Sequence, residues 1–364
     1  MTTIAVTGAR GFLGQHLRAA ALEYGTEVVG IPVGDEFDLS QASRAVSGAS
    51  RVIHLAGVNR GTDDEVMDGN ALFAAQVASA VESAAEPPSS VVYANSIQAG
   101  NGSVYGIAKQ AAAGTLGSAA QETGATFEDV LLPNLFGEYG RPFYNSVVAT
   151  FSHLLARSER PEVHQDKELT LLHAQNAADV LLGTVPLTAM DTLCQQVTVR
   201  GLKTLLEEVA ADYSVGEFPD LSTSFRRDLF NTYRAATFPD SAPTTITRHA
   251  DQRGSFFEIV RSRGGTGQTS FSTTAPGITR GDHFHRRKVE RFTVLAGEAE
   301  INLRHIFAGT VHSFRITGDE PSSVDMPTLY AHNIRNVGSS TLYTAFWTND
   351  IFDPSNPDTI SETV

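Results

Sequence analysis

A tyrosine and a lysine four residues apart, Tyr105 and Lys109, are the residues of this chain best suited to moving a proton. Four residues span about one helical turn, so the two side chains would lie on one face of a helix. An ammonium beside a phenol lowers the pKa of the phenol, because an opposite charge favours the ionised form. Such a tyrosine exchanges a proton with a sugar or alcohol oxygen near neutral pH. The spacing alone is more typical of an ordinary, partly exposed helix face, so its interpretation depends on the elements around it.

A serine upstream supports the catalytic interpretation. The run Val91–Ser96 predicts a buried strand that ends on Ser96, and a short glycine-rich loop separates it from Tyr105. In hydride transfer the serine would orient the reacting oxygen, the tyrosine would supply or remove the proton, and Lys109 would bind the ribose and polarise the tyrosine. The alternative for Ser96 is a strand-end hydroxyl without chemistry. We predict Ser96, Tyr105 and Lys109 as the catalytic residues.

A glycine-rich segment near the start of the chain predicts a dinucleotide phosphate site. It has the spacing GxxGxxG, with a short apolar run before it and a helix-like stretch after it. Gly8 would allow the tight turn, Gly11 the approach of a pyrophosphate, and Gly14 the close packing of helix on sheet. The helix N-terminus would then face the phosphates. The predicted cofactor contacts of this segment are Gly8, Arg10, Gly11, Phe12, Leu13 and Gly14.

The end of the second predicted strand, Glu27–Ile31, bears on the choice of cofactor. Many NAD enzymes carry an acidic residue there to hold the ribose hydroxyls, but this chain has Pro32 and Val33. Arg10, in the phosphate turn, would meet a 2′-phosphate. The sequence therefore favours NADPH, with NADH as the alternative.

Two further groups of residues complete the predicted cofactor site, in which Tyr105 and Lys109 also take part. Asp38 and Leu39 lie where the adenine edge is usually held, although a helix start without further role fits them too. Another predicted strand, beginning at Val52, ends in small residues that would let a nicotinamide riboside approach. The predicted contacts there are Leu55, Ala56 and Gly57.

Length and composition narrow the class of protein. The chain has 364 residues, which suggests about two domains. Its formal charge is -14, which argues against a nucleic-acid partner. The single cysteine excludes a disulfide framework and a thiolate metal site. No apolar run is long enough to span a membrane, and the first residues run into the glycine turn instead of a signal peptide. A cytoplasmic location is therefore the default expectation.

The pattern changes after a turn-rich break at 239–244. Strand and helix alternate before it, which predicts a parallel α/β fold of the Rossmann type. After it, short strands at regular spacing predict an all-β sandwich or barrel. We place the domains at residues 1–243 and 244–364.

The second half contains a constellation of metal-ligating residue types. His283 and His285 alternate on a predicted strand, so both side chains would share a face, and Glu290 begins the next strand. His332 follows in a second segment and supplies a fourth ligand. Three imidazoles and one carboxylate suit zinc, iron, manganese or nickel, and we favour zinc. The alternative is plain surface polarity beside the basic run Arg286–Lys288.

These strings resemble known families. The first half resembles an extended short-chain dehydrogenase of the kind that acts on nucleotide sugars, in which Leu132–Gly137 and the residues after it would shape the sugar site. The second half resembles a cupin, whose first metal motif it matches at every anchor position. The second motif usually has glycine where this chain has Leu329.

The combination in one chain resembles the CapF (WbjC) family of capsular and O-antigen polysaccharide enzymes over almost the whole sequence. The strings that carry this resemblance are His54–Arg60, Ser96–Ala99, Tyr144–Phe151, Asp251–Phe256, Pro276–Thr279 and the tail from Phe352 to Thr359. The residues around Pro32 and Val33 are less basic than is usual in the family, which leaves the cofactor preference open.

The resemblance implies a bifunctional enzyme. Its substrate would be a UDP-2-acetamido-2,6-dideoxy-4-hexulose, a UDP-linked 4-keto-6-deoxy amino sugar. The cupin domain would invert carbon 3, and the dehydrogenase domain would reduce the 4-keto group with NADPH to UDP-2-acetamido-2,6-dideoxy-L-talose, on the way to N-acetyl-L-fucosamine. The family also implies a homodimer. Candidate proton carriers in the cupin are His305, Tyr330 and Lys288, each of which also fits an ordinary barrel-lining or exposed position.

Two alternatives remain open from the sequence. In one, the chain is a 4-keto-sugar reductase whose cupin only binds sugar or supports a dimer, and the metal only braces the barrel. In the other, the chain is a sugar-nucleotide sensor with an idle site, against which the intact Ser96, Tyr105 and Lys109 argue.

Overall fold

The computed structural model of the chain describes residues 2–364, which pack into two compact units. The first unit contains the residues up to Leu135 together with Thr170–Gln196. The second contains Phe136–Leu169 and Val197–Val364. Within residues 2–364 no helix is both long and apolar enough to cross a membrane.

The first unit is built on a five-stranded parallel sheet. Its strands, in the order in which they pair, are β2 (Thr26–Ile31), β1 (Thr2–Thr7), β3 (Arg51–His54), β4 (Ser90–Ser96) and β5 (Thr126–Leu132). The order changes direction at β1, which pairs with β2 on one side and β3 on the other. Ligands of open α/β sheets bind beyond the carboxyl ends of the strands at such a switch point.

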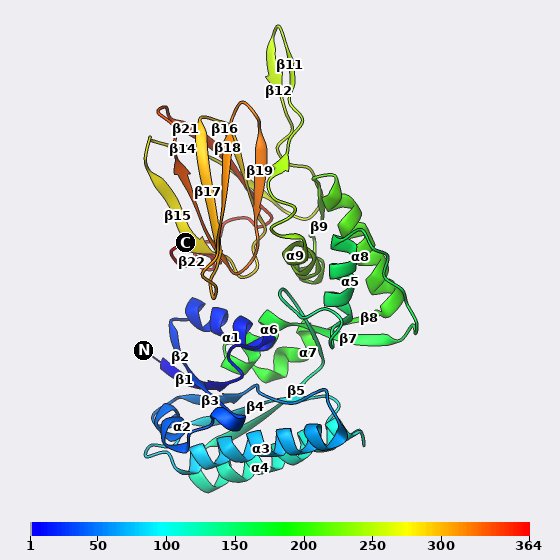
Figure 1. The fold of residues 1–364 in the computed structure, drawn as a ribbon, viewed down its shortest axis with the longest axis vertical. Coiled ribbons are helices and arrows are strands. Elements are labelled where there is room, and N and C mark those ends of the chain that lie inside the picture. The colour runs from blue at the N-terminus through cyan, green and yellow to red at the C-terminus, as the bar shows by residue number, and fades with distance from the viewer. Residues whose placement is uncertain (1) are drawn as a thin grey trace. The chain divides into compact units, whose positions relative to one another are not determined.

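Helices cover both faces of this sheet (Figure 1). One face carries α1 (Phe12–Glu23), α6 (Ala174–Leu182) and α7 (Met190–Leu193). The other carries α2 (Leu39–Val46), α3 (Asp63–Glu82) and α4 (Val104–Thr123). Two short 3-10 helices, Gly34–Glu36 and Leu187–Ala189, lie in the connections.

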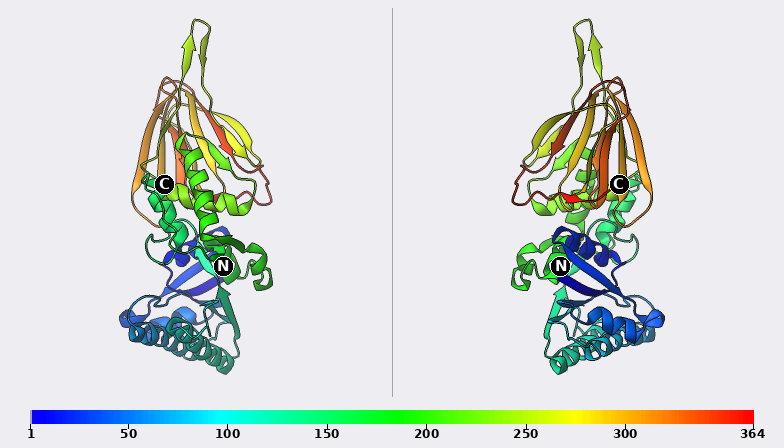
Figure 2. Two further views of the ribbon diagram at one scale, coloured as in Figure 1. Left: turned by 90° about the vertical axis from the view of Figure 1, so that its right-hand side faces the viewer. Right: turned by 90° about the vertical axis from the view of Figure 1, so that its left-hand side faces the viewer.

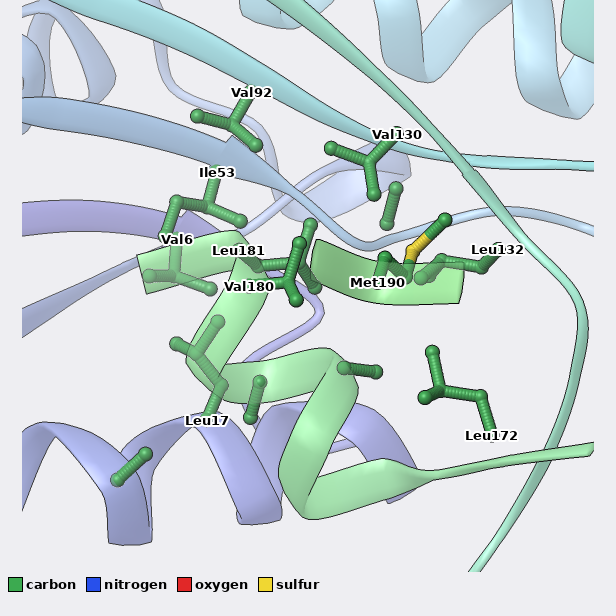
Figure 3. Close-up of a cluster of buried hydrophobic side chains, with 14 of the residues drawn as sticks. Val6, Leu17, Ile53, Val92, Val130, Leu132, Leu172, Val180, Leu181 and Met190 are labelled. Atoms are coloured by element: carbon green, nitrogen blue, oxygen red, sulfur yellow. The ribbon is translucent and has the colours of Figure 1, made fainter. Parts of the chain in front are cut away.

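The strands are apolar on both sides, as expected for a parallel sheet buried between helices. Val6, Ile53 and Val92 pack with Leu17 and Leu181 in the cluster drawn in Figure 3. The neighbouring positions along the same strands face the opposite layer, where α2, α3 and α4 cover them. This double burial fixes where the carboxyl ends of the strands, and the loops on them, must lie.

The second unit combines three helices with a β-sandwich barrel. The helices are α5 (Val147–Ala156), α8 (Val199–Ser214) and α9 (Ser224–Thr237). One barrel sheet pairs β10 (Thr244–Thr245), β19 (Ser322–Met326), β16 (Glu290–Ala296), β21 (Leu342–Thr348) and β14 (Gln268–Thr274). The other pairs β18 (Val311–Thr317), β17 (Glu298–His305), β20 (Tyr330–Asn336), β15 (Thr279–Phe284) and β22 (Ile360–Ser361).

Several short strands complete the chain. A hairpin of β11 (His249–Asp251) and β12 (Gly254–Phe256) projects from the barrel (Figure 2). Strand β9 (Phe218–Asp220) pairs with β13 (Ser262–Gly264), which attaches the α8–α9 segment to the barrel region. Strands β6 (Asn134–Phe136), β7 (Glu168–His173) and β8 (Gln195–Thr198) lie where the chain passes between the two units.

The predicted fold classes, Rossmann-type α/β and cupin-like all-β, are both confirmed. The two compact units are defined by which residues pack together. The helices α5, α8 and α9 therefore belong to the same unit as the barrel, although they precede residue 244. Phe218 stacks on Trp347 of the barrel with ring centroids 4.4 Å apart, and Tyr213 donates to Asp325 at 2.9 Å. The division of the chain into domains 1–243 and 244–364 stays a prediction about folding units.

Gly14 gives the first prediction, because α1 leaves no room for a side chain there. A Cβ at this position would lie 2.3 Å from the carbonyl oxygen of Gly8. We expect Gly14→Ala to destabilise the chain by about 1–3 kcal/mol through overpacking. Gly114→Ala, in α4, meets nothing within 4 Å and should leave stability unchanged or raise it by about 0.5–1 kcal/mol. Thermal unfolding measures both, and equal melting temperatures for Gly14→Ala and the wild type would contradict this packing.

Candidate functional site

The predicted dinucleotide residues gather at the carboxyl edge of the parallel sheet. Gly8 to Gly14 form the turn from β1 into α1, and Asp38 and Leu39 begin α2. Leu55, Ala56 and Gly57 follow β3 directly. Asp38 caps α2 by accepting from Gln41 N–H at 2.8 Å, so its structural role at the helix start is established and its adenine contact stays a prediction.

The glycine turn is packed tightly against the loop after β3. Gly8 has φ +68°, a left-handed conformation that favours glycine, and a Cβ on it would lie 2.9 Å from the Ala56 nitrogen. The Thr7 hydroxyl accepts from the N–H groups of Leu55 and Ala56 at 3.1 and 3.2 Å. Sequence reasoning missed Thr7, whose only signal is a polar residue at the end of a buried strand.

The start of α1 has the features of a phosphate site. Its N-cap is Gly11, which offers no side-chain acceptor to the first backbone N–H groups of the helix. Arg10 is exposed in the same turn, and burial, followed by the charge of Arg10, lowers the pKa of Arg18. Unfilled N–H donors and two neighbouring cations fit a dinucleotide with its phosphates.

The catalytic candidates come together as predicted. Ser96 ends β4, and Ser103 caps α4 by accepting from Gly106 N–H at 3.0 Å, which sets the helix phase. Tyr105 and Lys109 lie one turn apart near the start of that helix. A side-chain hydrogen bond joins Ser96 and Tyr105.

Lys109 is almost wholly buried, with the residue 4% exposed. Nζ donates to the carbonyl oxygen of Ala94 at 2.7 Å and lies 4.0 Å from the centroid of the Tyr93 ring. Burial lowers the pKa of Lys109 to about 7, against an opposing attraction from Asp129. The lysine therefore titrates close to neutral pH in the cofactor-free protein.

The pKa of Tyr105 is raised, contrary to our expectation that Lys109 would lower it. Burial raises the pKa of this phenol, and only the hydrogen bond from Ser96 opposes the rise. The reason is that Lys109 directs its ammonium to Ala94 and Tyr93 instead. In the cofactor-free protein Tyr105 is thus held as a neutral phenol, the form that donates a proton.

A second row of polar groups behind Lys109 was not identified from the sequence. The His54 ring stacks on Tyr93 at 5.4 Å, and its Nδ1 lies 2.7 Å from the Thr7 hydroxyl. Burial, followed by the charge of Lys109, lowers the pKa of His54 to about 3, so the ring stays neutral. These contacts connect the glycine turn to Lys109 through Thr7, His54 and Tyr93. In the sequence these three residues look like ordinary members of buried strands.

In the barrel, the four predicted metal ligands converge. One ligand atom from each of His283, His285, Glu290 and His332 lies within 4.8 Å of the others. They come from the end of β15, the loop after it, the start of β16 and the middle of β20. We expected His283 and His285 to share one face of a regular strand, which holds only in part. Strand β15 ends at Phe284, and its pairing with β20 shifts register between Gly281 and His283.

Two of the imidazoles are already oriented for coordination. Nδ1 of His285 lies 2.6 Å from the carbonyl oxygen of Asp358, and Nδ1 of His332 lies 3.1 Å from that of Tyr330. Their Nε2 atoms point at one oxygen of Glu290, at 3.0 and 3.1 Å. A carbonyl partner on Nδ1 fixes the tautomer and leaves Nε2 to bind a metal. The set therefore fits a divalent cation.

The electrostatics agree with a cation site. Burial acts to raise the pKa of Glu290, but His285 and His332 outweigh it and hold this pKa well below its usual range. Burial lowers the pKa of His283 to about 3, with His332 and His285 adding to the effect. A charged carboxylate beside a neutral imidazole is the form in which both groups ligate metals.

The turn before His332 keeps its shape without glycine. Leu329 has φ +62° and is fully buried, in the left-handed region where side chains are usually avoided. Its N–H donates to His285 O at 2.9 Å, and its carbonyl oxygen accepts from Ile306 N–H at 3.0 Å. These bonds hold the strained turn, so the departure from the cupin pattern does not remove the ligand.

Residues from before the barrel reach this same turn. Thr328 donates to the buried Glu138 carboxylate at 2.7 Å, and the Tyr139 hydroxyl donates to Thr328 O at 2.6 Å. The Tyr139 ring meets His305 edge-on, with centroids 4.8 Å apart, and His305 lies 5.4 Å from Tyr330. Sequence reasoning missed Glu138 and Tyr139, because nothing local connects them to a turn almost two hundred residues away.

Two known protein families match this chain, one over its first half and the other over the barrel. Residues 4–183 match the NAD dependent epimerase/dehydratase family, and residues 249–360 match the polysaccharide biosynthesis C-terminal domain. A curated relative from Pseudomonas aeruginosa, UDP-2-acetamido-2,6-beta-L-arabino-hexul-4-ose reductase, is 31% identical over 98% of this chain and 97% of its own.

A solved structure extends the match to the whole fold. The capsular polysaccharide assembling protein CapF from Staphylococcus aureus is 31% identical, with a TM-score of 0.62, over 99% of this chain and 100% of its own. The chain belongs to the CapF family. The CapF resemblance inferred from the local strings is thereby confirmed, and with it the NAD(P)-dependent nucleotide-sugar reductase and epimerase class.

A more distant structure shows the fold alone. The UDP-glucose 4-epimerase of Thermotoga maritima, solved with UDP-glucose, is 16% identical with a TM-score of 0.53 over 66% of this chain and 99% of its own. In this chain the α/β fold is combined with the barrel that holds the cluster of His283, His285, Glu290 and His332.

The burial of Lys109 leads to a pH prediction. Its pKa of about 7 means that the ammonium is present below that pH and lost above it. A dinucleotide is anionic, so its affinity should fall as the pH rises through about 7. NADH is the better probe, because it has no 2′-phosphate to titrate in this range. We expect its Kd to rise between about pH 6 and about pH 8.5, and Lys109→Met to bind weakly with no such slope. An equal slope in both proteins would contradict the assignment.

Proposed function

We propose that the chain converts a UDP-2-acetamido-2,6-dideoxy-4-hexulose to UDP-2-acetamido-2,6-dideoxy-L-talose by inverting carbon 3 and reducing the 4-keto group with NADPH. The observation that carries the proposal is the presence of two separate sets of reactive groups in one chain. Ser96, Tyr105 and Lys109 suit the hydride step, and the His/Glu cluster suits the proton shift. The end-to-end match with a relative named as a 4-ulose reductase supports the substrate class.

In the reductive step the chain positions the keto oxygen and supplies a proton. NADPH, when bound, supplies the hydride to carbon 4. Ser96 and Tyr105 hydrogen-bond the carbonyl oxygen, and Tyr105 gives its phenolic proton to that oxygen as the hydride arrives. Lys109, which donates to Ala94 O in the cofactor-free chain, would redirect its ammonium to hold the ribose and to stabilise the phenolate that remains. The sum is one hydride and one proton added across the C=O bond.

In the epimerisation the chain removes and returns one proton. The 4-keto group acidifies the hydrogen on carbon 3, so a base can take it and a donor on the other face can return one. A divalent metal held by His283, His285, Glu290 and His332 would stabilise the negative charge that develops on the keto oxygen. The carbon skeleton and oxidation state do not change.

Strand pairing supports two of the three candidate proton carriers, His305, Tyr330 and Lys288. His305 pairs across strands with Tyr330, and Leu303 pairs with the ligand His332, two positions along on the same strands. Side chains two apart share a face, so His305 and Tyr330 lie on the ligand side of the sheet. Lys288 instead donates to Pro357 O at 2.7 Å and is engaged there. We assign the two proton-transfer roles to His305 and Tyr330.

A second function is favoured by one observation, the contact of both His285 Nε2 and His332 Nε2 with the same oxygen of Glu290. Such a closed set also suits a metal that only braces the barrel. The chain would then be an NADPH-dependent 4-keto-sugar reductase with a non-catalytic cupin.

We also infer the setting from the CapF family. The chain would act as a homodimer in the cytoplasm, in the synthesis of UDP-N-acetyl-L-fucosamine for a capsule or O antigen. NADPH is preferred to NADH in this proposal because Arg10 lies exposed in the phosphate turn.

A substrate panel tests the function. The full-length protein is given UDP-linked 4-keto-6-deoxy sugars with NADPH, oxidation is followed by absorbance, and NMR gives the product configuration. We expect the 2-acetamido hexulose to be reduced with inversion at carbon 3. Retention at carbon 3 would favour the reductase with a non-catalytic cupin, and no oxidation with any sugar would contradict the proposal. Tyr105→Phe should lower kcat by about 10²–10⁴-fold, whereas Tyr24→Phe, on an exposed phenol, should not change it.

A further inference from the structure

Three consecutive backbone N–H groups in the metal-site loop converge on a single carboxylate from the end of the chain. Arg286 N–H donates to one oxygen of Asp358 at 3.0 Å, and those of Arg287 and Lys288 donate to the other at 2.8 and 2.7 Å. Asp358 is only 7% exposed. Successive N–H groups of this kind form an anion-binding nest, here filled by the protein's own side chain.

The backbone of the same residue contacts a metal ligand. The Asp358 carbonyl oxygen lies 2.6 Å from Nδ1 of His285, whose Nε2 faces Glu290. Because a carbonyl oxygen can only accept, Nδ1 is the donor and carries the proton. The single residue Asp358 therefore shapes the loop between two ligands and sets the tautomer of one of them.

Contacts on both sides of Asp358 hold it in this position. Its φ of +42° lies in the left-handed region, which aspartate tolerates better than most residues. After it, Ile360 and Ser361 of β22 pair with Phe284 and His283 of β15. Before it, Pro357 O accepts from the Lys288 ammonium at 2.7 Å. The tail from Pro357 to Ser361 therefore lies along the segment from His283 to Lys288 and holds it by strand pairing and hydrogen bonds.

We propose that Asp358 is a positioning residue of the metal centre and that the tail from Pro357 to Ser361 acts as a clamp on the ligands. The inference rests on the proposed metal site and extends it. The clamp presets the separation of His285 and Glu290, so less ordering is needed when a cation binds. Partners that orient metal ligands in this way typically change metal affinity by about 10–100-fold.

Asp358→Asn in the full chain tests the clamp. The amide would turn an NH2 group toward at least one of the three N–H donors, so the nest loses an acceptor while the side-chain volume is kept. We expect the zinc affinity, measured by competition with a chromophoric chelator, to fall by about 10–100-fold. The visible spectrum of the Co²⁺-loaded variant should also change, because the ligand geometry relaxes. A purely structural role would lower the melting temperature and leave both readouts unchanged.

The matched control is Asp353→Asn in the same tail. Asp353 is exposed and bonds only within the tail, to the Ser355 N–H at 2.9 Å and hydroxyl at 2.7 Å. The zinc affinity of the Asp353→Asn protein should equal that of the wild type.

Each outcome decides something different. A folded Asp358→Asn protein with wild-type zinc affinity and Co²⁺ spectrum would overturn the clamp but not the metal site. Wild-type protein that binds no metal would overturn the metal site itself. If Asp358→Asn does not fold, Lys288→Met decides, since it removes the ammonium bonds to Pro357 O and the Thr359 hydroxyl and leaves the Lys288 N–H on Asp358. A weaker zinc affinity in that variant supports the clamp, and an unchanged one contradicts it.

Discussion

The buried carboxylate of Glu290 is the constraint around which the barrel is arranged. An ionised carboxylate out of water is costly unless it is paired, and Glu290 is 9% exposed. The structure meets this cost with two imidazole contacts to one oxygen, and the neutral His283 completes the set. The strained Leu329 turn and the tail around Asp358 both bond to His285 and help to hold these groups at short range. A barrel interior built this way favours a cation.

The α/β unit also buries a charged group, but here the group is a cation, Lys109, instead of an anion. Lys109 is a buried ammonium with a carbonyl oxygen and an aromatic face as its partners and no carboxylate in direct contact among its described hydrogen bonds. Such partial compensation leaves a pKa near neutrality, which is useful for a proton-transfer site. The two sites thus differ in design. The barrel site is preset by contacts among its own ligands, and the α/β site is left to be completed by an anionic cofactor.

The sequence predicted the elements whose signals are local. The GxxGxxG turn, Ser96, the Tyr105–Lys109 pair and the four metal ligands all lie in short strings whose spacing has a direct geometric meaning. The raised pKa of Tyr105 was not predictable, because it depends on the burial of the phenol in the folded chain, while Lys109 directs its ammonium to Ala94 O. Glu138, Tyr139 and Asp358 were missed for a related reason. Their partners lie about 70 to 190 residues away, and only the folded chain brings them together.

The same long-range contacts decide how the central claim is best tested. Thr328 and Asp325 bond to Tyr139 and Tyr213, which precede residue 244, so the full chain is the right material. The most direct measurement is deuterium uptake at carbon 3 of the 4-keto sugar in D₂O, without NADPH, using Tyr105→Phe to block reduction. Two separate reaction sites predict uptake at carbon 3 well above that in buffer, and its loss in His332→Ala. Uptake no faster than in buffer would contradict the account.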